Sequence, residues 1–442
     1  MRQPILLKRR RSVESVYLYN DARSWNRITL ENAAKTDRRN AEALTLDSEY
    51  RFDPATGLWA LIVEGRADRP SNTERYRSAE GSDTGHEHDS SCPFCLGNEL
   101  ETPEAVAVAA LKHDLGEKDE YEVDDFEIVT SSPDTEVEGR EWLTRVFENK
   151  YPAFRMNRKE GDESTFTSVE KRFFDDELPN PSFFNSISGR GRHEVIVDSP
   201  RHVRGWGDLS PLEVKLTFRM FHSRLHALRA TGCFAYSFVF KNTGVTAGAS
   251  QRHLHCQLTG NIELPPTIRD ELERLIRYEQ TRLARGEQLS YWDALLDAEL
   301  RAKERIVAVT DRFVVYCPYA SRVPMQTEIC PRFNDPFEDY DEAALDELAL
   351  LARRAVIALE EVKRRHYPDE PDPLDYNVVL KNAPTLLEPD ISEYRGLMRP
   401  RWLILPSIIK RGGFELGCCI DINPVSPETS ARMLRDTFPL VK

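Results

Sequence analysis

The sequence predicts an α+β fold in two similar halves, each a mainly antiparallel sheet with packed helices. Two observations predict it. Short β-type segments separated by turns occur in both halves of the 442 residues, and each half also carries one long segment with helical periodicity. We expect the halves to span residues 46–285 and 286–442, after an N-terminal extension of residues 1–45.

The first half gives a sequence of strand, turn and helix signals. Residues 50–63 predict two strands joined by a tight turn that contains Pro54 and Gly57. Residues 71–91 are rich in Gly, Ser, Asp and Glu, which predicts a loop. Apolar spacing further along predicts helices over 211–230 and 268–283, and strands over 194–197, 235–240 and 253–258.

The second half repeats this style. A charged segment over 286–304 has helical propensity, and we expect it to connect the halves. A long helix is predicted over 341–365, because its apolar residues form a core-facing stripe of Leu345, Leu348, Leu351, Val356, Ile357 and Leu359. Strands are predicted over 306–309, 313–316, 376–380 and 402–405.

Composition excludes several classes of function. The net charge of -14 disfavours binding to nucleic acid or to membrane surfaces, so an anionic ligand must meet locally placed positive groups. No run of about 18 apolar residues exists, which argues against a transmembrane helix. The basic start, Met1 to Val13, lacks the apolar core of a signal peptide. We therefore expect a cytoplasmic protein.

Two of the eight cysteines form a Cys92-Pro93-Phe94-Cys95 motif. Without a secretory signal, this spacing indicates metal or redox chemistry, and two thiolates at this spacing suit one tetrahedral zinc ion. His202 and His253 are candidates for the remaining ligands, which would make a closed, structural site. Buried or redox-active thiols without a metal are an equal alternative. His86 and His88 also lie near the motif, in an acidic loop that favours solvated side chains.

Polar side chains alternate along the predicted strand over 253–258. His253, His255 and Gln257 would share one face, since successive side chains of a strand point to opposite faces. A neutral imidazole is a competent nucleophile at pH 7. His255 is the better nucleophile if His253 binds a metal, and Gln257 could donate hydrogen bonds to phosphate oxygens. The alternative is a polar sheet face without catalytic function.

A glycine-punctuated loop precedes this strand. Ser250 and the backbone amides of Gly248 and Ala249 could surround a phosphate group. Lys241 and Arg252 are possible counter-charges. A phosphate-handling site is the hypothesis that joins the loop to the histidines.

Several motifs occur in the order of a known family. They are Tyr50-Arg51-Phe52-Asp53-Pro54, Arg66-Ala67-Asp68-Arg69-Pro70, Cys92-Pro93-Phe94-Cys95-Leu96-Gly97-Asn98, Phe147-Glu148-Asn149-Lys150-Tyr151-Pro152-Ala153, Arg192 to His202, the His253-Leu254-His255-Cys256-Gln257 segment, Gly413-Phe414-Glu415-Leu416 and Ile422-Asn423-Pro424. Through them the chain resembles the galactose-1-phosphate uridylyltransferase family of the histidine-triad superfamily. The resemblance covers residues 48 to 436. It implies two histidine-triad-like halves duplicated in one chain.

The resemblance implies catalytic and metal-binding roles for matching residues. His255 would be the nucleophile, Gln257 would steady the nucleotidylated histidine, and Ser250 would contact phosphate. The implied cofactor is Zn2+, held by Cys92, Cys95, His202 and His253.

The resemblance also implies substrate contacts. Asn149 would contact the nucleoside, Asn242 the phosphates and Glu415 the sugar hydroxyls. Arg66 and Arg69 would reach phosphates, in family members from the neighbouring subunit of a homodimer. The implied partners are a nucleotide sugar and a sugar 1-phosphate or phosphate.

The second half departs from the family pattern. Members typically carry a Trp-His-x-His or similar cluster there, sometimes with a second metal, whereas residues 401–406 here are Arg-Trp-Leu-Ile-Leu-Pro. We therefore expect no second metal site, and full turnover by this half is in doubt. Leu254 stands where uridylyltransferases usually have proline, and Phe414 where some have tyrosine.

The expected function is transfer of a nucleoside monophosphate between sugar 1-phosphates through a nucleotidyl-histidine. A UDP-glucose:hexose-1-phosphate uridylyltransferase of galactose metabolism does this. One alternative is an enzyme like the ADP-glucose or diadenosine polyphosphate phosphorylases. Another is a non-catalytic, zinc-stabilised binding protein. The motifs do not separate uridine from adenine nucleotides, or one sugar or acceptor from another.

Overall fold

The computed structural model describes residues 48–53, 58–63, 88–112, 121–132, 135, 137, 140–156, 186–367, 373–385 and 392–438. The predicted extension over 1–45, the predicted turn at Pro54 and Gly57, and the arginine pair Arg66 and Arg69 lie outside these residues. So does His86. Within the described part of the chain, no helix is both long and apolar enough to cross a membrane.

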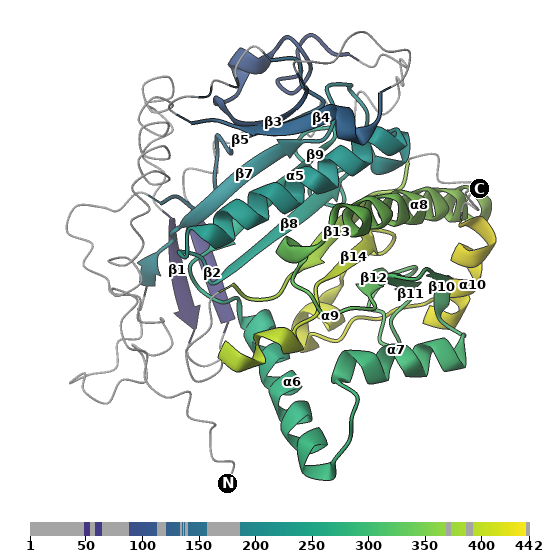
Figure 1. Cartoon of the computed structure of the whole chain (residues 1–442). Helices are drawn as coiled ribbons and strands as arrows, with labels where there is room; N and C mark the ends of the chain where they lie inside the picture. The colour runs from purple at the N-terminus through teal and green to yellow at the C-terminus, as the bar shows by residue number, and fades with distance from the viewer. Residues whose placement is uncertain are drawn as a thin grey trace, which may run out of the picture.

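One long antiparallel sheet runs through the molecule (Figure 1). Eleven strands of the described residues form it, and each neighbouring pair is antiparallel. Their order across the sheet is β10 (Ile306–Val309), β11 (Phe313–Tyr316), β12 (Thr327–Pro331), β14 (Arg401–Pro406), β13 (Tyr376–Lys381), β8 (Tyr236–Thr243), β9 (His255–Asn261), β7 (Gly191–Val197), β5 (Thr144–Glu148), β3 (Ala105–Leu111) and β4 (Phe126–Thr130).

The same run of elements occurs twice. The first half contains β7, α5 (Pro211–Ala230), β8 and β9, and the second contains β12, α8 (Glu342–His366), β13 and β14. Across the sheet the order β7-β9-β8 is followed by β13-β14-β12, so the halves meet where β8 pairs with β13. The predicted duplicated α+β fold is confirmed. The boundary at residue 285 stays a prediction.

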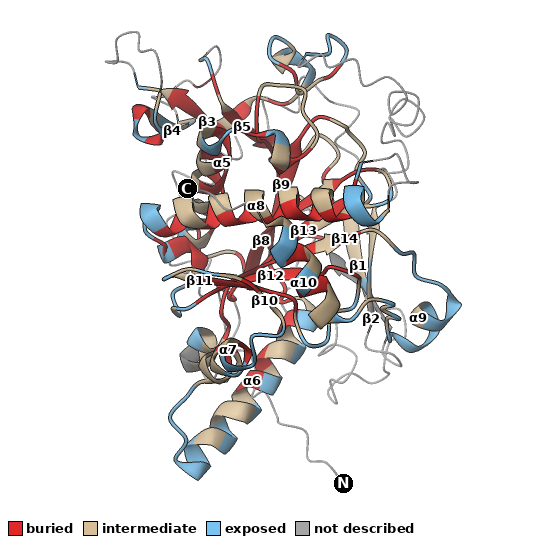
Figure 2. Ribbon diagram, turned by 90° about the vertical axis from the view of Figure 1, so that its right-hand side faces the viewer, coloured by how far each residue is buried: buried red, intermediate tan, exposed pale blue. Residues whose placement is uncertain are grey.

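Helices α5 and α8 lie side by side on one face of the sheet (Figure 1). Helix α5 begins at Pro211 because Ser210 and Glu213 form a reciprocal capping box, with proline at the first helical position. Figure 2 shows that α8 turns its buried residues inward, while α6 (Pro266–Arg285) extends away from the sheet.

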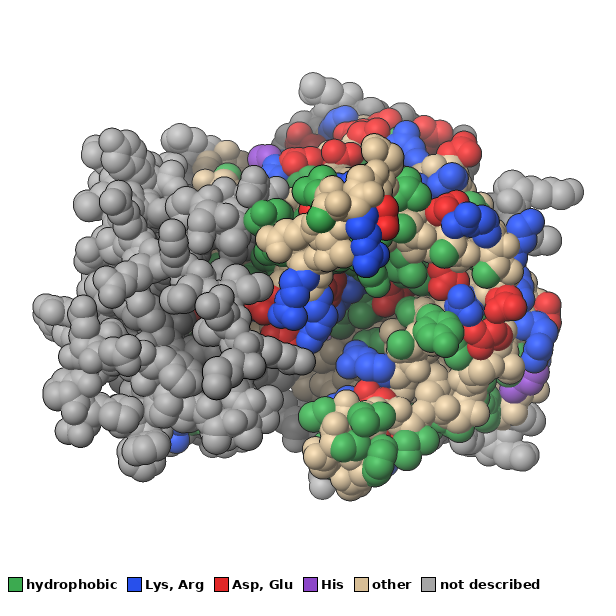
Figure 3. Space-filling model, turned by 90° about the horizontal axis from the view of Figure 1, so that it is seen from below, with side chains coloured by type: hydrophobic (Ala, Val, Ile, Leu, Met, Phe, Trp, Pro, Cys, Tyr) green, Lys and Arg blue, Asp and Glu red, His purple; other side chains and the backbone are tan. Residues whose placement is uncertain are grey.

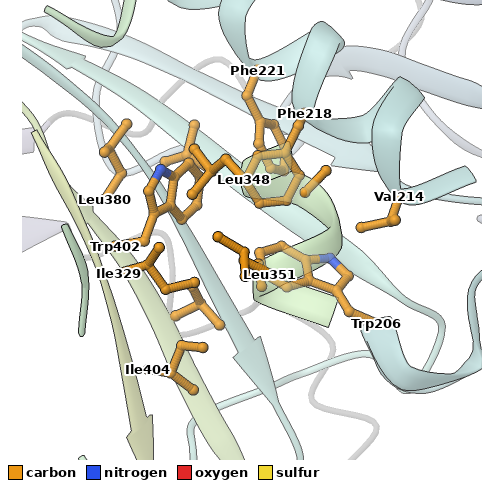
Figure 4. Packing of buried hydrophobic residues seen from close by; sticks show 14 of the residues in the cluster. Trp206, Val214, Phe218, Phe221, Ile329, Leu348, Leu351, Leu380, Trp402 and Ile404 are labelled. Carbon is orange, nitrogen blue, oxygen red and sulfur yellow. The ribbon is translucent and has the colours of Figure 1, made fainter. Parts of the chain in front are cut away.

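Both halves contribute to one aromatic core (Figure 4). Trp402 of β14 packs against Phe218 and Phe221 of α5, with ring centroids 4.8 and 5.7 Å apart. Trp206 lies at the same place and is fully buried. Because large aromatic side chains bury much apolar area, this cluster joins the two halves into a common hydrophobic core.

The remaining elements flank this sheet. Helix α7 (Tyr291–Ala302) covers the other face of the second half, where Trp292 and Leu296 pack on β11 and β12. The first turns of α6 pack instead with Tyr236 of β8 and with Ala383 and Met398. A small separate sheet contains β1 (Ser48–Asp53), β2 (Leu58–Val63) and β6 (Ser186–Ser188). Two C-terminal helices follow β14, namely α9 (Gly413–Cys418) and α10 (Pro427–Thr437).

The predicted elements agree closely with the observed ones where periodicity is strong. The helices predicted over 211–230 and 341–365 match α5 and α8 within one residue at each end. Strands β3, β4, β5, β6 and β12 were not predicted. Strand β3 has the sequence AVAVAAL and is buried on both faces, so it shows no alternation and its alanines favour helix.

Candidate functional site

The four predicted metal ligands lie close together just before the start of β9. The ligand atoms of Cys92, Cys95, His202 and His253 all lie within 4.8 Å of one another. Nδ1 of His253 is 3.6 Å from Sγ of Cys92 and 3.5 Å from Sγ of Cys95, and Nδ1 of His202 is 3.4 Å from Sγ of Cys95. A tetrahedral zinc ion separates sulfur and nitrogen ligands by about 3.5 Å. The arrangement therefore fits zinc.

The imidazole of His253 is oriented by a bond on its other nitrogen. Nε2 lies 2.9 Å from the carbonyl oxygen of Ser199, to which it donates in the neutral ring. The lone pair of Nδ1 then faces the two sulfur atoms, as a metal ligand requires. Burial lowers the pKa of His253 to about 3 and raises the pKa of the Cys92 thiol to about 12. A bound cation would reverse this preference for neutral thiols.

Strand β9 begins at His255, two residues after the predicted start, so His253 lies in the preceding loop. His253 and His255 consequently belong to different elements, one to the loop and one to the start of the strand. Nδ1 of His255 lies 2.9 Å from the carbonyl oxygen of His253 and donates to it. This bond leaves the lone pair on Nε2. The ring of Phe94, from the cysteine motif, packs edge-on against His255 at 5.2 Å.

A cavity of ≈ 450 Å³ opens beside this imidazole. Three predicted functional side chains besides His255 line it, namely Gln257, Ser250 and Asn149. Phe94 and Phe147 supply apolar wall, and Lys150 contributes a positive charge at the rim. The cavity thus combines an apolar surface with hydrogen-bond donors and an imidazole, a lining that suits a nucleotide better than a plain sugar.

The loop before β9 is held by residues of the second half. Thr246 donates to Oδ2 of Asp375 from its backbone nitrogen at 2.8 Å and from Oγ1 at 2.6 Å. Asn377 donates from Nδ2 to Oδ1 of Asn242 at 2.9 Å and to the carbonyl oxygen of Ala247 at 2.8 Å. The loop that leads to Ser250 therefore depends on β13 for its shape.

Lys241 does not serve as a counter-charge for phosphate, contrary to the sequence-based hypothesis. Its side chain is buried on the core face of β8, where Nζ donates to the carbonyl oxygen of His255 at 3.1 Å. Its charge faces Asp198 at 3.7 Å. Strand alternation places Lys241 opposite the cavity face, because its neighbours Phe240 and Asn242 point the other way.

Glu415 does not lie at the cavity. Its carboxylate accepts a hydrogen bond from the backbone nitrogen of Gly412 at 2.8 Å and caps α9. Asn242 is also not among the residues lining the cavity, but it lies beside the loop that carries Ser250. His88 is exposed, as the acidic loop suggested, and its Nε2 is 3.1 Å from the carbonyl oxygen of Leu96.

Charged side chains surround Arg401 of β14, in the segment where the family resemblance leads one to expect histidines. Arg401 contacts Oε1 of Glu271 at 2.8 Å and Oε2 of Glu328 at 3.3 Å, and Lys381 contacts the other oxygen of Glu271 at 2.6 Å. Glu328 also accepts from the hydroxyl of Tyr316 at 3.1 Å. Two cations, Arg401 and Lys381, thus pair with these two carboxylates.

Sequence reasoning gave no role to His193, Asp375 or Asn377. His193 lies on β7 and contacts Oε1 of Gln257 through Nε2 at 2.9 Å. The spacing of His193 and Gln257 along the chain gives no sign of this contact, because it depends on the antiparallel register of β7 and β9. The register of β8 and β13 brings Asn377 to Asn242 in the same way.

The sequence of the chain is similar to one family model and to several known proteins. The family model described as Galactose-1-phosphate uridyl transferase, N-terminal domain, matches residues 103–265. An ADP-glucose phosphorylase of Arabidopsis thaliana is 26% identical over 392 residues, which covers 88% of this chain and 92% of the relative. A galactose-1-phosphate uridylyltransferase of Thermotoga maritima is 23% identical over 405 residues, covering 88% and 98%.

Solved structures share the fold. One described as a uridylyltransferase has a TM-score of 0.60 at 20% identity, covering 88% of this chain and 98% of the other. The ADP-glucose phosphorylase of Arabidopsis thaliana with bound ADP-glucose has a TM-score of 0.56 at 24% identity, covering 88% and 99%.

The fold and these similarities support a duplicated histidine-triad nucleotidyltransferase. Within that class, residues 103–265 match the N-terminal-domain model of the galactose-1-phosphate uridylyltransferase family, and the chain resembles a divergent member of that family.

Proposed function

We propose that the protein moves a nucleoside monophosphate from a nucleotide sugar to a second phosphate through a covalent nucleotidyl-His255. One observation carries this proposal. The bond from Nδ1 of His255 to the carbonyl oxygen of His253, at 2.9 Å, leaves Nε2 as the nucleophile beside the cavity. The model reaction is that of a UDP-glucose:hexose-1-phosphate uridylyltransferase of galactose metabolism.

The reaction is a double displacement. Nε2 of His255 attacks the α-phosphorus of a nucleoside diphosphate sugar, a nitrogen–phosphorus bond forms, and the bond to the bridging oxygen breaks. The sugar 1-phosphate leaves with that electron pair. An oxygen of the second phosphate then attacks the same phosphorus, and the electron pair of the nitrogen–phosphorus bond returns to Nε2.

The ring carries a positive charge while it bears the nucleotidyl group. Its Nδ1–H continues to donate to the carbonyl oxygen of His253, which stabilises this charge. Gln257 and Ser250 line the cavity and would donate to the non-bridging phosphate oxygens, where negative charge develops. Asn149 would contact the nucleoside, and Asn242 would support the loop over residues 244–254 (the phosphate loop), which carries Ser250.

Zinc at Cys92, Cys95, His202 and His253 would have a structural role, since four protein ligands leave no open position. The ion would supply a fixed crosslink between the cysteine motif and the segment before β9. His253 then holds its carbonyl oxygen in place for His255. Thiolate ligands of this kind suit the reducing cytoplasm.

The acceptor has two candidates. A sugar 1-phosphate would make the protein a uridylyltransferase-like enzyme. Inorganic phosphate would make it a phosphorylase. The similarity to most of the Arabidopsis ADP-glucose phosphorylase supports this second acceptor, so both acceptors are tested.

A homodimer would complete the sugar end of the site. Four large hydrophobic side chains on and after α9 are exposed, and a second copy of the chain would cover them: Phe414, Leu416, Ile420 and Ile422. The space-filling view from below shows hydrophobic side chains exposed on this side of the molecule (Figure 3). Glu415 lies on the same helix and would reach a sugar across the interface, as Arg66 and Arg69 would reach phosphates.

A labelling experiment tests the proposal. The protein is incubated with UDP-glucose or ADP-glucose labelled with 32P at the α-phosphorus, and the denatured protein is examined for an acid-labile, base-stable label. We expect label in the wild type and none in His255→Ala. His226→Ala serves as the matched control, because His226 is an exposed histidine of α5 remote in sequence from the motif.

Discharge of the label identifies the acceptor. Galactose 1-phosphate and inorganic phosphate are added separately, and the released nucleotides are separated. Absence of label with both UDP-glucose and ADP-glucose would favour the non-catalytic binding protein. Label that persists in His255→Ala would place the nucleophile elsewhere.

A further inference from the structure

The side-chain oxygen of Gln257 is enclosed by two donors. Nε2 of His193 lies 2.9 Å from Oε1 of Gln257, and Nδ2 of Asn149 lies 3.4 Å from the same oxygen. His193 and Gln257 are 4% and 6% exposed, so water cannot readily replace these contacts. The oxygen of the amide is therefore bound to two protein donors, which leaves the NH2 group as the half of the amide that a phosphate in the cavity would meet.

Two backbone amides set the direction of these hydrogen bonds. The backbone nitrogen of Ala153 lies 2.9 Å from Nδ1 of His193, and that of Tyr151 lies 2.9 Å from Oδ1 of Asn149. A backbone N–H can only donate. Nδ1 of His193 must therefore carry the lone pair, which puts the proton on Nε2 of the neutral ring.

The same reasoning fixes the amide of Asn149. Its oxygen accepts from Tyr151, so its nitrogen is the atom that approaches Gln257. Nδ2 of Asn149 and Nε2 of His193 are 3.1 Å apart and both donate to Oε1 of Gln257. A flipped Gln257 would set its NH2 group against two N–H donors.

We propose that His193 is a positioning residue that locks the amide of Gln257 with its NH2 group toward the reacting phosphate. The inference rests on the proposed function, in which His255 carries a nucleotidyl group. A phosphate needs a donor here, whereas the amide oxygen would repel it. The backbone N–H groups of Tyr151 and Ala153 thus fix the hydrogen-bond directions of Asn149 and His193. These two side chains in turn fix the orientation of the Gln257 amide at the site of nucleotidyl transfer.

Three substitutions distinguish this role from simple packing. His193→Gln can accept from Ala153 through its oxygen and donate to Gln257 through its nitrogen. His193→Glu has nearly the same shape as His193→Gln but offers an acceptor on both sides, which draws the NH2 group of Gln257 away from the cavity. His193→Leu offers neither. Zinc content and the thermal midpoint of each variant report whether it folds.

The first readout needs no activity. The chain has six glutamines, so selective 15N labelling of glutamine gives few side-chain NH2 signals, and Gln257→Ala assigns that of Gln257. We expect this NH2 pair to shift, and to rotate faster about its C–N bond, in His193→Leu. In His193→Gln it should keep the wild-type pattern. An unchanged Gln257 signal in His193→Leu would overturn the proposal.

The second readout is kinetic. We expect kcat for transfer to fall at least about tenfold in His193→Leu with little change in KM, to fall further in His193→Glu, and to recover largely in His193→Gln. In a Gln257→Ala background, His193→Leu should have almost no further effect, because the two act as a unit.

One kinetic outcome would overturn the positioning role, and one labelling outcome would overturn the proposed function. Additive losses in the double variant would overturn the positioning role, even though label forms on His255. Absence of label in the wild type would overturn the proposed function, while the 15N signal still decides whether His193 fixes the amide.

Discussion

Asn377 of the second half donates to Asn242 of the first half, with Nδ2 and Oδ1 2.9 Å apart. The two asparagines face each other because they are paired residues of β13 and β8, where the halves of the sheet meet. Nδ2 of Asn377 also donates to the carbonyl oxygen of Ala247, so both of its hydrogens are used. Strand β13 of the second half thereby holds the loop of the first half that leads to Ser250.

Replacing Asn377 with aspartate should lower activity. Aspartate keeps the shape but turns two donors into acceptors that face the oxygens of Asn242 and Ala247. Losing hydrogen bonds of this kind costs about 1–3 kcal/mol, so kcat/KM for the nucleotide sugar should fall roughly tenfold or more. Steady-state kinetics would measure this.

Asn334→Asp is the matched control for this change. Asn334 is on the surface and its Nδ2 donates to the carbonyl oxygen of Gly396, far along the chain from the phosphate loop. The Asn334→Asp variant should therefore retain the activity of the wild type. Equal activity of Asn377→Asp and the wild type would show that the second half does not shape the loop.

The sequence predicts the parts of this protein that depend on local signals. Helix α5 could be placed from its apolar spacing, and the spacing of the cysteine motif indicated metal or redox chemistry. The fold class was predicted because short strands and one long helix occur in each half. These features need no knowledge of which strand pairs with which.

The remainder depends on contacts between distant segments. His193 approaches Gln257, and Asn377 approaches Asn242, through strand registers that no local pattern encodes. The strand face predicted over 253–258 does not include His253, because this residue precedes β9 and its imidazole faces the two thiols. Lys241 was misassigned since its charge has a buried partner, Asp198.

Zinc removal should destabilise the protein. We expect one zinc ion per chain by elemental analysis, and loss of the ion in Cys95→Ser. The buried thiols are neutral without a cation, because burial raises the pKa of Cys92 to about 12, so metal binding should release protons that a weakly buffered titration detects. Chelation should lower the thermal midpoint.

Cys418→Ser is the control for zinc binding. Cys418 is exposed on α9, so this variant should keep its zinc and its midpoint. A full complement of zinc in Cys95→Ser would show that the ion lies elsewhere.

Glu360 should make stability depend on pH. Burial in α8 raises its pKa from 4.5 to about 7, with a smaller rise from Asp208 and an opposing effect of Arg204. Between these values the folded chain holds a proton that the unfolded chain releases, so stability falls as pH rises from 4.5 to about 7. The total loss is on the order of 3 kcal/mol.

Glu360→Gln removes this titration. By urea unfolding it should be more stable than the wild type at pH 8 and similar at pH 5. The control is Glu361→Gln, next in sequence, whose exposed carboxylate pairs with Arg364 and Arg365 and should not gain stability at pH 8. A difference between Glu360→Gln and the wild type that is independent of pH would contradict the prediction.

Two glycines of the phosphate loop should respond differently to alanine. Gly244 and Gly248 both have positive φ, +87° and +85°, so alanine strains the backbone by roughly 1 kcal/mol at either position. At Gly244 the new Cβ would also lie 1.6 Å from Oδ1 of Asp375, while at Gly248 the nearest atom is 3.9 Å away. Gly244→Ala must therefore displace Asp375 from Thr246 and from its ion pair with Arg204.

Urea unfolding should show a larger loss for Gly244→Ala than for Gly248→Ala, by about 3 kcal/mol, since a half-buried charge pair is broken. Combining Gly244→Ala with Asp375→Ala tests the cause, because the carboxylate that clashes is then gone. The alanine at position 244 should cost only its backbone strain in that background. An undiminished cost there would mean that the conformation of Gly244, and not the contact with Asp375, sets the shape of the loop.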